Sequence, residues 1–263
     1  MEEQDLDFLT GKAADLIINA KKIVVFTGAG VSTESGIPDF RSPGGICEKY
    51  KPGDFTYRRF LSSPEARRKV WQMRRDGDGG IPLDAEPNPA HYAIAEMDRL
   101  GKLDCVITQN VDSLHQKAGL SDDKVIELHG SMQWAVCLRC GRRYPFEQIR
   151  VMLDRGEETP DCEICHGILK PDAVFFGESL PPKVLAEATR RSQSCDLFIV
   201  IGSTLVVTPA AWMPRYAINS GAKLVIINLS TTPMDSEATV VIRAKAGEVM
   251  PQIMQRVREK NSH

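Results

Sequence analysis

The sequence has no long apolar run, no excess of basic residues and no repeat or low-complexity segment. No stretch approaches the ~20 apolar residues that span a bilayer. The acidic N-terminal segment also lacks the basic region and apolar core of a signal peptide. With a formal net charge of −2, the chain does not have the basic balance typical of a surface that follows nucleic-acid phosphates. We therefore expect a cytoplasmic, monomeric protein that binds neither membrane nor nucleic acid directly.

The chain also lacks the even number of cysteines that a disulfide framework needs. Four of its seven cysteines form two pairs, Cys137-x-x-Cys140 and Cys162-x-x-Cys165, with 21 residues between them. Two such pairs can hold one zinc ion tetrahedrally, and four protein ligands leave no open position for catalysis. We predict one structural zinc ion in a reducing compartment, with redox pairs or free thiols as the alternative.

The other cysteines, and the histidine beside the second pair, need no functional role. Cys47, Cys105 and Cys195 are unpaired in the sequence and are expected to be small buried apolar side chains. His166 adjoins Cys165, but four thiolates already complete a tetrahedron, so we expect a bystander.

Apolar, β-branched runs alternate with amphipathic segments along most of the chain. The runs predict buried strands at 22–28, 104–110, 124–130, 196–204 and 223–230. The intervening patterns predict helices at 63–75, 88–102, 182–195, 209–222 and 247–260, where Pro251 must lie in the first turn or kink the helix. This order indicates an α/β fold with a doubly wound, mainly parallel sheet, into which the cysteine block is inserted as a small module.

Two glycines after the first strand suggest nucleotide binding, but the pattern is incomplete. Gly28 and Gly30 would let backbone approach a phosphate, whereas Thr33 stands where a third glycine is usual. The usual acidic ribose ligand would fall near residues 47–51, in an irregular segment and not at a strand end. The sequence therefore does not predict an ordinary dehydrogenase site.

Polar side chains follow several of the predicted strands. Gln109, Asn110, Asp112 and His129 would meet at the carboxyl edge of the sheet, where ligands bind in doubly wound folds. A lone histidine is usually structural, but the position of His129 at a strand end beside a glycine favours a functional role. We interpret His115 as structural.

These motifs together resemble the sirtuin family of NAD-dependent protein deacylases. The matching stretches are GAGVSTESGIPDFR, TQNVDSLH, LHG, the two C-x-x-C pairs, FFGESLP, GSTLVVTPA, INLS and KAGEVM, in the order of the family. The resemblance implies a Rossmann-like large domain (1–43, 89–130 and 173–263). It also implies a small domain made of a helical insertion (44–88) and a zinc-ribbon module (131–172). NAD would be consumed while an acyl group leaves lysine as O-acyl-ADP-ribose, with nicotinamide released.

The resemblance also assigns residue roles. His129 would be the general base, and Asn110 and Asp112 would line the catalytic pocket for the carboxamide of NAD. The implied NAD-binding residues are Gly28, Ala29, Gly30, Thr33, Pro38, Asp39, Phe40, Arg41, Gln109, Asn110, Asp112, Gly202, Ser203, Thr204, Asn228, Leu229, Ser230 and Ala246. The implied acyl-peptide contacts, made by strand addition, are His129, Val174, Phe175, Phe176, Gly177, Glu178 and Val206.

One branch of the family prefers succinyl or malonyl lysine and carries Y-x-x-R in the helical insertion. The corresponding segment here, KVWQMRRDGDGG at 69–80, has no tyrosine, so we expect acetyl or longer apolar acyl groups. Arg74 and Arg75 are interpreted as a solvated helix face. The physiological substrate stays open. Two other functions stay open as well: ADP-ribosyl transfer to protein, and NAD sensing without turnover.

Overall fold

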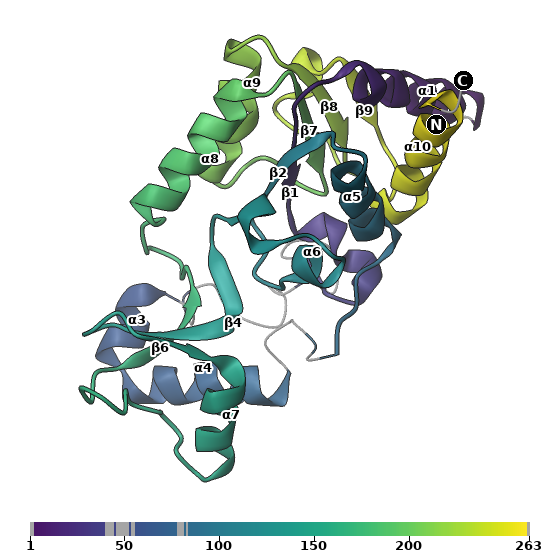
Figure 1. The fold of residues 1–263 in the computed structure, drawn as a ribbon. Helices are drawn as coiled ribbons and strands as arrows, with labels where there is room; N and C mark the ends of the chain where they lie inside the picture. The colour runs from purple at the N-terminus through teal and green to yellow at the C-terminus, as the bar shows by residue number, and fades with distance from the viewer. Residues whose placement is uncertain are drawn as a thin grey trace.

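The main sheet of the protein is parallel throughout (Figure 1). The structure, a computed structural model, describes residues 3–39, 45, 53, 56–77, 82 and 84–261. The strands lie in the order β3 (Val125–Glu127), β2 (Leu103–Thr108), β1 (Ile23–Thr27), β7 (Leu197–Ile201), β8 (Lys223–Ile227) and β9 (Val240–Ile242). The five predicted strands are all present, and β9 was not predicted because its apolar run has only three residues. The strands end earlier than predicted, so their polar ends form turns.

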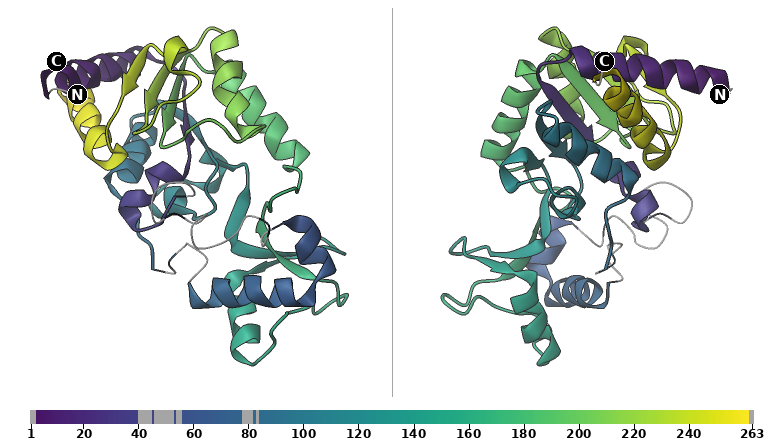
Figure 2. Two further views of the ribbon diagram at one scale, coloured as in Figure 1. Left: turned by 180° about the vertical axis from the view of Figure 1, so that it is seen from behind. Right: turned by 45° about the vertical axis from the view of Figure 1, so that its right-hand side comes forward.

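Helices cover both faces of this sheet, as a doubly wound fold requires (Figures 1 and 2). One face carries α1 (Glu3–Asn19), α5 (Pro89–Arg99) and α10 (Ala246–Asn261), and the other carries α8 (Pro182–Ser194) and α9 (Met213–Asn219). Alternate residues of each strand pack into the two apolar cores, one on each face of the sheet. In β1, Ile23 and Val25 join the α1/α5/α10 core, whereas Val24 and Phe26 join the α8/α9 core. The fold class predicted from the sequence is thus confirmed.

One helix prediction needs correction. The helix expected at 209–222 begins only at Met213, because residues Ala210–Trp212 form a 3-10 turn. Pro251 lies within α10 and beyond its first turn, which starts at Ala246, so the first of the two alternatives predicted for this proline does not hold. By contrast, α5 begins as expected. The side-chain oxygen of Asn88 accepts a hydrogen bond from Ala90 N, and Nδ1 of His91 accepts one from Asn88 N, which together cap the helix.

A second, antiparallel sheet lies below the first in Figure 1. Its order is β5 (Arg143–Pro145), β4 (Gly130–Cys137) and β6 (Leu169–Ala173). The remaining helices are α3 (Tyr57–Ser62), α4 (Pro64–Asp76), α6 (Leu114–Lys117) and α7 (Phe146–Asp154). Trp71 of α4 is 1% exposed and packs into the same apolar cluster as Cys137 and Ile149. The inserted helix and the cysteine module therefore share one core.

The prediction for Arg74 and Arg75 is half wrong. Arg75 is partly exposed and pairs with Asp76, but Arg74 is buried and its guanidinium lies over the ring of Phe146 at 4.0 Å. Within the part of the chain that the structure describes, helices are too short or too polar to cross a membrane.

Candidate active site

The turns after β1 and β7 interlock at the carboxyl edge of the main sheet. The amide of Gly30 donates to the carbonyl of Gly202 at 2.9 Å, and Gly28 donates to Ile201 at 3.1 Å. A β-carbon on Gly28 would lie 2.8 Å from that Gly202 carbonyl, and one on Gly202 would lie 2.2 Å from Val31 N. Gly202 also has φ +63°, in the left-handed region that favours glycine. The glycines are thus required for contact between two backbone turns, in addition to any approach of a phosphate.

Asn110 and Asp112 are held together by a residue that the sequence did not single out. Ser32 donates its hydroxyl hydrogen to Asp112 Oδ2 at 2.8 Å, and Asn110 Nδ2 donates to Ser32 Oγ at 3.0 Å. Asn110 Nδ2 also lies 3.2 Å from the carbonyl of Gly28. These side chains are buried, and burial raises the pKa of Asp112 although hydrogen bonds from Leu114 and Ser32 oppose that shift. Ser32 lies inside the GAGVSTES stretch, so its place beside two glycines was the signal available.

His129 stands half-buried at the end of β3, with one ring nitrogen already engaged. Its Nδ1 is 2.8 Å from the carbonyl oxygen of Gln109. A carbonyl can only accept, so Nδ1 carries the hydrogen and Nε2 keeps a lone pair for an incoming proton. Burial lowers the pKa of His129 below its ordinary 6.5, against the opposing effect of the Gln109 carbonyl. The imidazole is therefore neutral at pH 7 and has the correct tautomer for a general base.

Gln109 and His115 also lie near the turns after β1 and β7. Gln109 Nε2 donates to Ser203 Oγ at 2.8 Å, which ties the end of β2 to the turn after β7. His115 is buried below them, with Nε2 2.9 Å from Thr27 Oγ1. This buried hydrogen bond inside the sheet supports the structural interpretation of His115.

The remaining predicted NAD contacts surround these turns. Asn228 is buried at the end of β8 and donates to Ser230 O at 2.9 Å, whereas Leu229 is 66% exposed. Thr33 is exposed and donates to Gly30 O at 3.1 Å. Ala29 lies in the 3-10 turn after β1, Thr204 follows Ser203 after β7, and Ala246 is buried at the start of α10, whereas Pro38 and Asp39 are partly buried. Phe40 and Arg41, and likewise Cys47, lie outside the described residues.

The predicted peptide-binding segment adjoins His129 through the backbone. Val174 N donates to the carbonyl of His129 at 2.8 Å, and Tyr57 N donates to the carbonyl of Phe176 at 3.0 Å. Phe175 packs edge-on against Phe60 of α3, with ring centroids 5.2 Å apart. Phe176 and Val206 are half exposed, and Gly177 is also exposed. The segment thus has an open side and a fixed position relative to His129.

A buried lysine, Lys170, holds this segment in place through hydrogen bonds. Lys170 is 3% exposed, and its Nζ donates to the carbonyls of Pro171 at 3.0 Å and Ala173 at 2.6 Å. It also donates to Glu178 Oε2 at 3.1 Å, which accepts in turn from Phe175 N at 2.9 Å. Sequence reasoning missed Lys170, because a single lysine in a strand has no local signal of burial.

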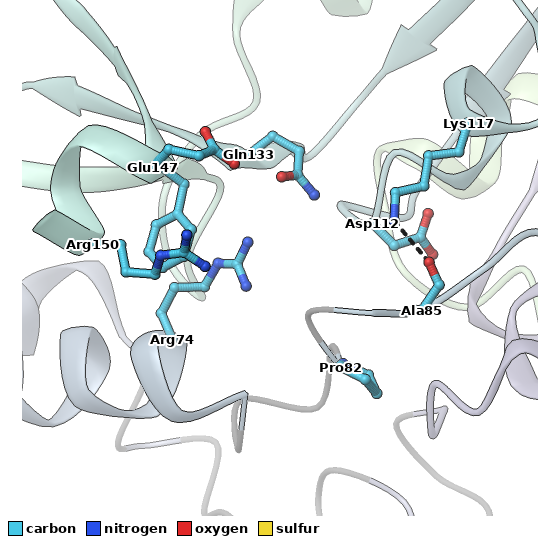
Figure 3. Close-up of a pocket in the computed structure, with 9 residues that line it drawn as sticks. Arg74, Pro82, Ala85, Asp112, Lys117, Gln133, Glu147 and Arg150 are labelled. Atoms are coloured by element: carbon cyan, nitrogen blue, oxygen red, sulfur yellow. Dashed lines mark hydrogen bonds between the residues drawn. The ribbon is translucent and has the colours of Figure 1, made fainter.

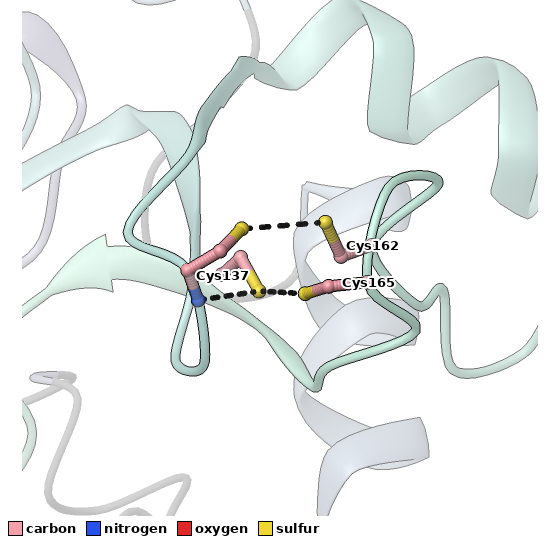
Figure 4. Close-up of side chains that lie close together, drawn as sticks. Cys137, Cys162 and Cys165 are labelled. Atoms are coloured by element: carbon pink, nitrogen blue, oxygen red, sulfur yellow. Dashed lines mark hydrogen bonds between the residues drawn. The ribbon is translucent and has the colours of Figure 1, made fainter.

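The four paired cysteines form a compact cluster (Figure 4). Their sulfur atoms all lie within 4.8 Å of one another, with Cys137–Cys165 at 3.4 Å and Cys140–Cys162 at 3.7 Å. Zn–S bonds of about 2.3 Å place tetrahedral sulfurs about 3.8 Å apart, so the cluster fits one structural zinc ion. The hydroxyl of Tyr144 lies 3.1 Å from Cys162 Sγ and lowers the pKa of this thiol to about 6. His166 is not part of the cluster.

Comparison with known proteins agrees with this arrangement. Residues 28–209 match the Sir2 family model. NAD-dependent protein deacetylase 2 of Streptomyces coelicolor is 44% identical over 88% of this chain and 96% of its own length. NAD-dependent protein deacylase 2 of Archaeoglobus fulgidus is 44% identical over 95% and 97%.

Solved structures agree as well. A Sir2 structure with a deacetylated p53 peptide and 3′-O-acetyl-ADP-ribose is 41% identical over 95% of this chain and 97% of its own, with a TM-score of 0.82. The sequence motifs, the interlocked glycine turns, the four-cysteine cluster and these relatives lead to one conclusion: the chain belongs to the Sir2 family.

Proposed function

We propose that the protein removes acetyl or other acyl groups from lysine side chains of proteins, in a reaction that consumes NAD. The observation that carries this proposal is the neutral His129, with Nε2 free to accept a proton, at the edge where the glycine turns meet Asn110 and Asp112. The names of the relatives, which are deacetylases and deacylases dependent on NAD, support the same chemistry. The reaction also consumes one water molecule, and its products are deacylated lysine, nicotinamide and O-acyl-ADP-ribose.

The residues present fit NAD as the co-substrate. The turns after β1 and β7 bring the backbone of Gly28, Gly30 and Gly202 together at the carboxyl edge of the sheet, where a pyrophosphate binds in folds of this kind. Gln109 would contact the ribose on the nicotinamide side, Ser203 would contact phosphate or the adenosine side, and Asn228 would contact the adenosine ribose. NAD supplies the ribose carbon that the acyl oxygen attacks as nicotinamide leaves.

We assign the following roles to side chains of the proposed active site. Asn110 and Asp112, which are held in place by Ser32, would orient the carboxamide of NAD. His129 takes a proton at Nε2 from a ribose hydroxyl, which makes the hydroxyl oxygen nucleophilic toward the acyl carbon. The buried strand residues beneath the turns would keep water away while the ribose hydroxyl attacks the acyl carbon, so that the acyl group passes to ribose; one water would then enter to release the lysine amine. The zinc ion would hold the small sheet together and take no part in the reaction.

The peptide would bind along residues 174–178. Val174 N donates to the carbonyl of His129, and the carbonyl of Phe176 accepts from Tyr57 N, so the segment is fixed beside His129 before it turns at Gly177. A substrate strand added here would be held mainly by main-chain bonds, which demand little of its sequence. Acetyl-lysine is the proposed principal substrate and the monomer the proposed active form. The predicted domain boundaries are likewise a proposal, supported by the core that Trp71 shares with the cysteine module.

The test follows nicotinamide release and peptide mass with an acetyl-lysine peptide and NAD. We expect release that depends on the peptide and a mass loss of one acetyl group. His129→Ala should bind NAD and keep its fold, yet lose at least 10²-fold in turnover, as expected for a general base. Absence of peptide-dependent release from the wild-type protein would contradict deacylation, and label from NAD on protein would favour ADP-ribosyl transfer.

A further inference from the structure

Residues 31–35, which directly follow the glycine turn after β1, are held in place by side chains from two other parts of the chain. The segment runs from one 3-10 turn into a second, which ends at Ser35. It carries Ser32, whose hydroxyl group is bonded to both Asp112 and Asn110. A displacement of this segment therefore also displaces the groups that we propose contact the carboxamide of NAD.

Asn88, the residue before α5, holds the segment at both of its ends. Its side chain is buried, and its Nδ2 donates to Val31 O at 2.7 Å and to Ser35 Oγ at 3.0 Å. The Oδ1 atom of the same amide accepts from Ala90 N at 2.9 Å and so caps α5. A buried amide nitrogen without an acceptor is costly, so these two bonds tie residues 31–35 firmly to the start of α5.

The backbone that leads into Asn88 is itself fixed to α6. Lys117 Nζ donates to Ala85 O at 2.8 Å, a bond that Figure 3 shows. Ala85 also belongs to a small buried apolar cluster that contains Ile37 and Leu114. The cluster joins the chain just beyond the segment to the chain just before Asn88, so both sides of the contact are held.

Glu34 connects the same segment to the start of α10. Its side chain is exposed, and its Oε2 accepts from Gly247 N at 2.7 Å. A carboxylate is stabilised at a helix N-terminus, where the amide hydrogens have no partner inside the helix. A β-carbon on Gly247 would lie 2.8 Å from both carboxylate oxygens, so the contact requires glycine there. This helix end also carries Ala246, a predicted NAD contact.

We propose that Asn88 and Glu34 are positioning residues for NAD, because they fix residues 31–35 between the N-termini of α5 and α10. They act through Ser32 and the glycine turn, and not on the reacting atoms. With both contacts in place, binding of NAD does not have to order this segment. When one contact is lost, the arrangement that binds NAD is populated less often, and the apparent affinity falls by the same factor. The role of both residues rests on the proposed use of NAD.

The variant Asn88→Asp separates the two functions of this side chain. Aspartate keeps an oxygen that caps α5, but it replaces the amide donor with a second oxygen that faces Val31 O. The matched control is Ser63→Asp, which also places a carboxylate at the first position of a helix, here the N-cap of α4.

The contact with α10 is tested from both of its partners. Glu34→Ala removes the acceptor, whereas Glu34→Gln keeps an oxygen that can accept from Gly247 N. Glu248→Ala, at an exposed carboxylate of the same helix end, controls for the loss of one negative charge. Gly247→Ala would displace the Glu34 carboxylate, although alanine favours the helix. It should therefore weaken NAD binding without lowering the free energy of unfolding, and it should add nothing in the Glu34→Ala background.

Three measurements are made on each variant: the dissociation constant of NAD by calorimetry, steady-state kinetics with an acetyl-lysine peptide, and amide hydrogen exchange without NAD. We expect Asn88→Asp and Glu34→Ala to raise the dissociation constant and the KM of NAD about tenfold, with kcat within about threefold of wild type. Amides of residues 31–36, which are bonded within the segment, should exchange faster. Glu34→Gln should recover most of the affinity, and both controls should match the wild-type protein.

Wild-type dissociation constants and exchange rates in both Asn88→Asp and Glu34→Ala would overturn the positioning role, as would equal losses in the two controls. Glu34 is exposed, so its variants decide the question even if Asn88→Asp does not fold. A wild-type protein that binds NAD but does not deacetylate the peptide would contradict the proposed function alone, because binding and exchange are measured without turnover. Failure of the wild-type protein to bind NAD would overturn both.

Discussion

Replacing Lys170 with methionine tests whether the ion pair between Lys170 and Glu178 positions residues 174–178, the proposed peptide-binding segment. Methionine keeps the length and apolar stem of lysine but removes three hydrogen bonds, to Pro171 O, Ala173 O and Glu178 Oε2. Burial lowers the pKa of Lys170, and the nearby Glu178 carboxylate opposes this shift. Without Lys170, the Glu178 carboxylate keeps only its bond from Phe175 N.

The expected magnitude follows from the burial of the two partners. Removing one member of a buried ion pair costs about 3–5 kcal/mol. The side chain of Lys170 is 4% exposed but that of Glu178 is 20% exposed, so water will partly solvate the remaining carboxylate. We expect the free energy of unfolding to fall by about 3 kcal/mol, near the lower end of that range. If half of this loss acts locally on residues 174–178, the segment is found in its binding conformation about tenfold less often.

The assays are urea unfolding and steady-state kinetics with an acetyl-lysine peptide. KM for the peptide should rise about tenfold while KM for NAD and kcat stay within about threefold, a split that a general loss of folded protein would not produce. Lys170→Arg should recover part of the peptide affinity. Lys183→Met, at an exposed lysine of α8, is the control for loss of one positive charge. An unfolding free energy and a peptide KM at the wild-type values would refute the positioning role.

Three further predictions concern histidine burial, the metal cluster and the glycine turns. Burial lowers the pKa of His91 from 6.5 to about 4. As the pH falls, the imidazole of His91 is therefore protonated in the unfolded chain before it is protonated in the folded protein. The free energy of unfolding consequently decreases between pH 6.5 and pH 4. The loss by pH 5 is about 2 kcal/mol, and His91→Gln, which can still cap α5, should flatten that slope in urea unfolding at pH 5 and 7. Cys137→Ser or a strong chelator should lower the free energy of unfolding by at least ~3 kcal/mol, because structural zinc contributes to folding directly. Gly202→Ala should destabilise by about 3 kcal/mol or more, since its β-carbon would lie 2.2 Å from Val31 N, whereas Gly221→Ala, with nothing within 4 Å, should cost only about 1–2 kcal/mol.

Each of these has a result that would count against it. An unchanged pH slope in His91→Gln would mean that another group sets the acid sensitivity. Equal unfolding curves with and without chelator, with the metal content measured, would exclude a stabilising ion. Equal costs at Gly202 and Gly221 would show that the turns after β1 and β7 can separate without loss.

The main sheet was predictable because its strands are buried on both faces and so appear as continuous apolar runs. The small sheet was not, because β4 reads GSMQWAVC, in which polar and apolar residues do not alternate regularly, and its pairing with β6 is interrupted between Gly130 and Ala135. The thiol cluster was predictable from spacing alone, since the ligands come from two tight turns.

The site was predictable where side chains directly follow strands, as at Asn110 and His129. It was not predictable where burial depends on distant contacts. Arg74 lies in a polar helix, and it contacts Phe146 and Met132 of other elements. Lys170 donates to two carbonyls of β6 itself, those of Pro171 and Ala173, and to Glu178 beyond the strand, and no periodicity reveals this set of bonds.

His129 is bonded to both sheets at once, and this has a consequence for movement. Its ring is tied to Gln109, at the end of β2, and its carbonyl is tied to Val174, at the end of β6. If one sheet turns relative to the other, a residue bonded to both lies near the axis and is displaced least. His129 would therefore act as a pivot. A rotation of one sheet relative to the other would then move more distant elements, such as α4, which carries Arg74, while leaving His129 nearly in place.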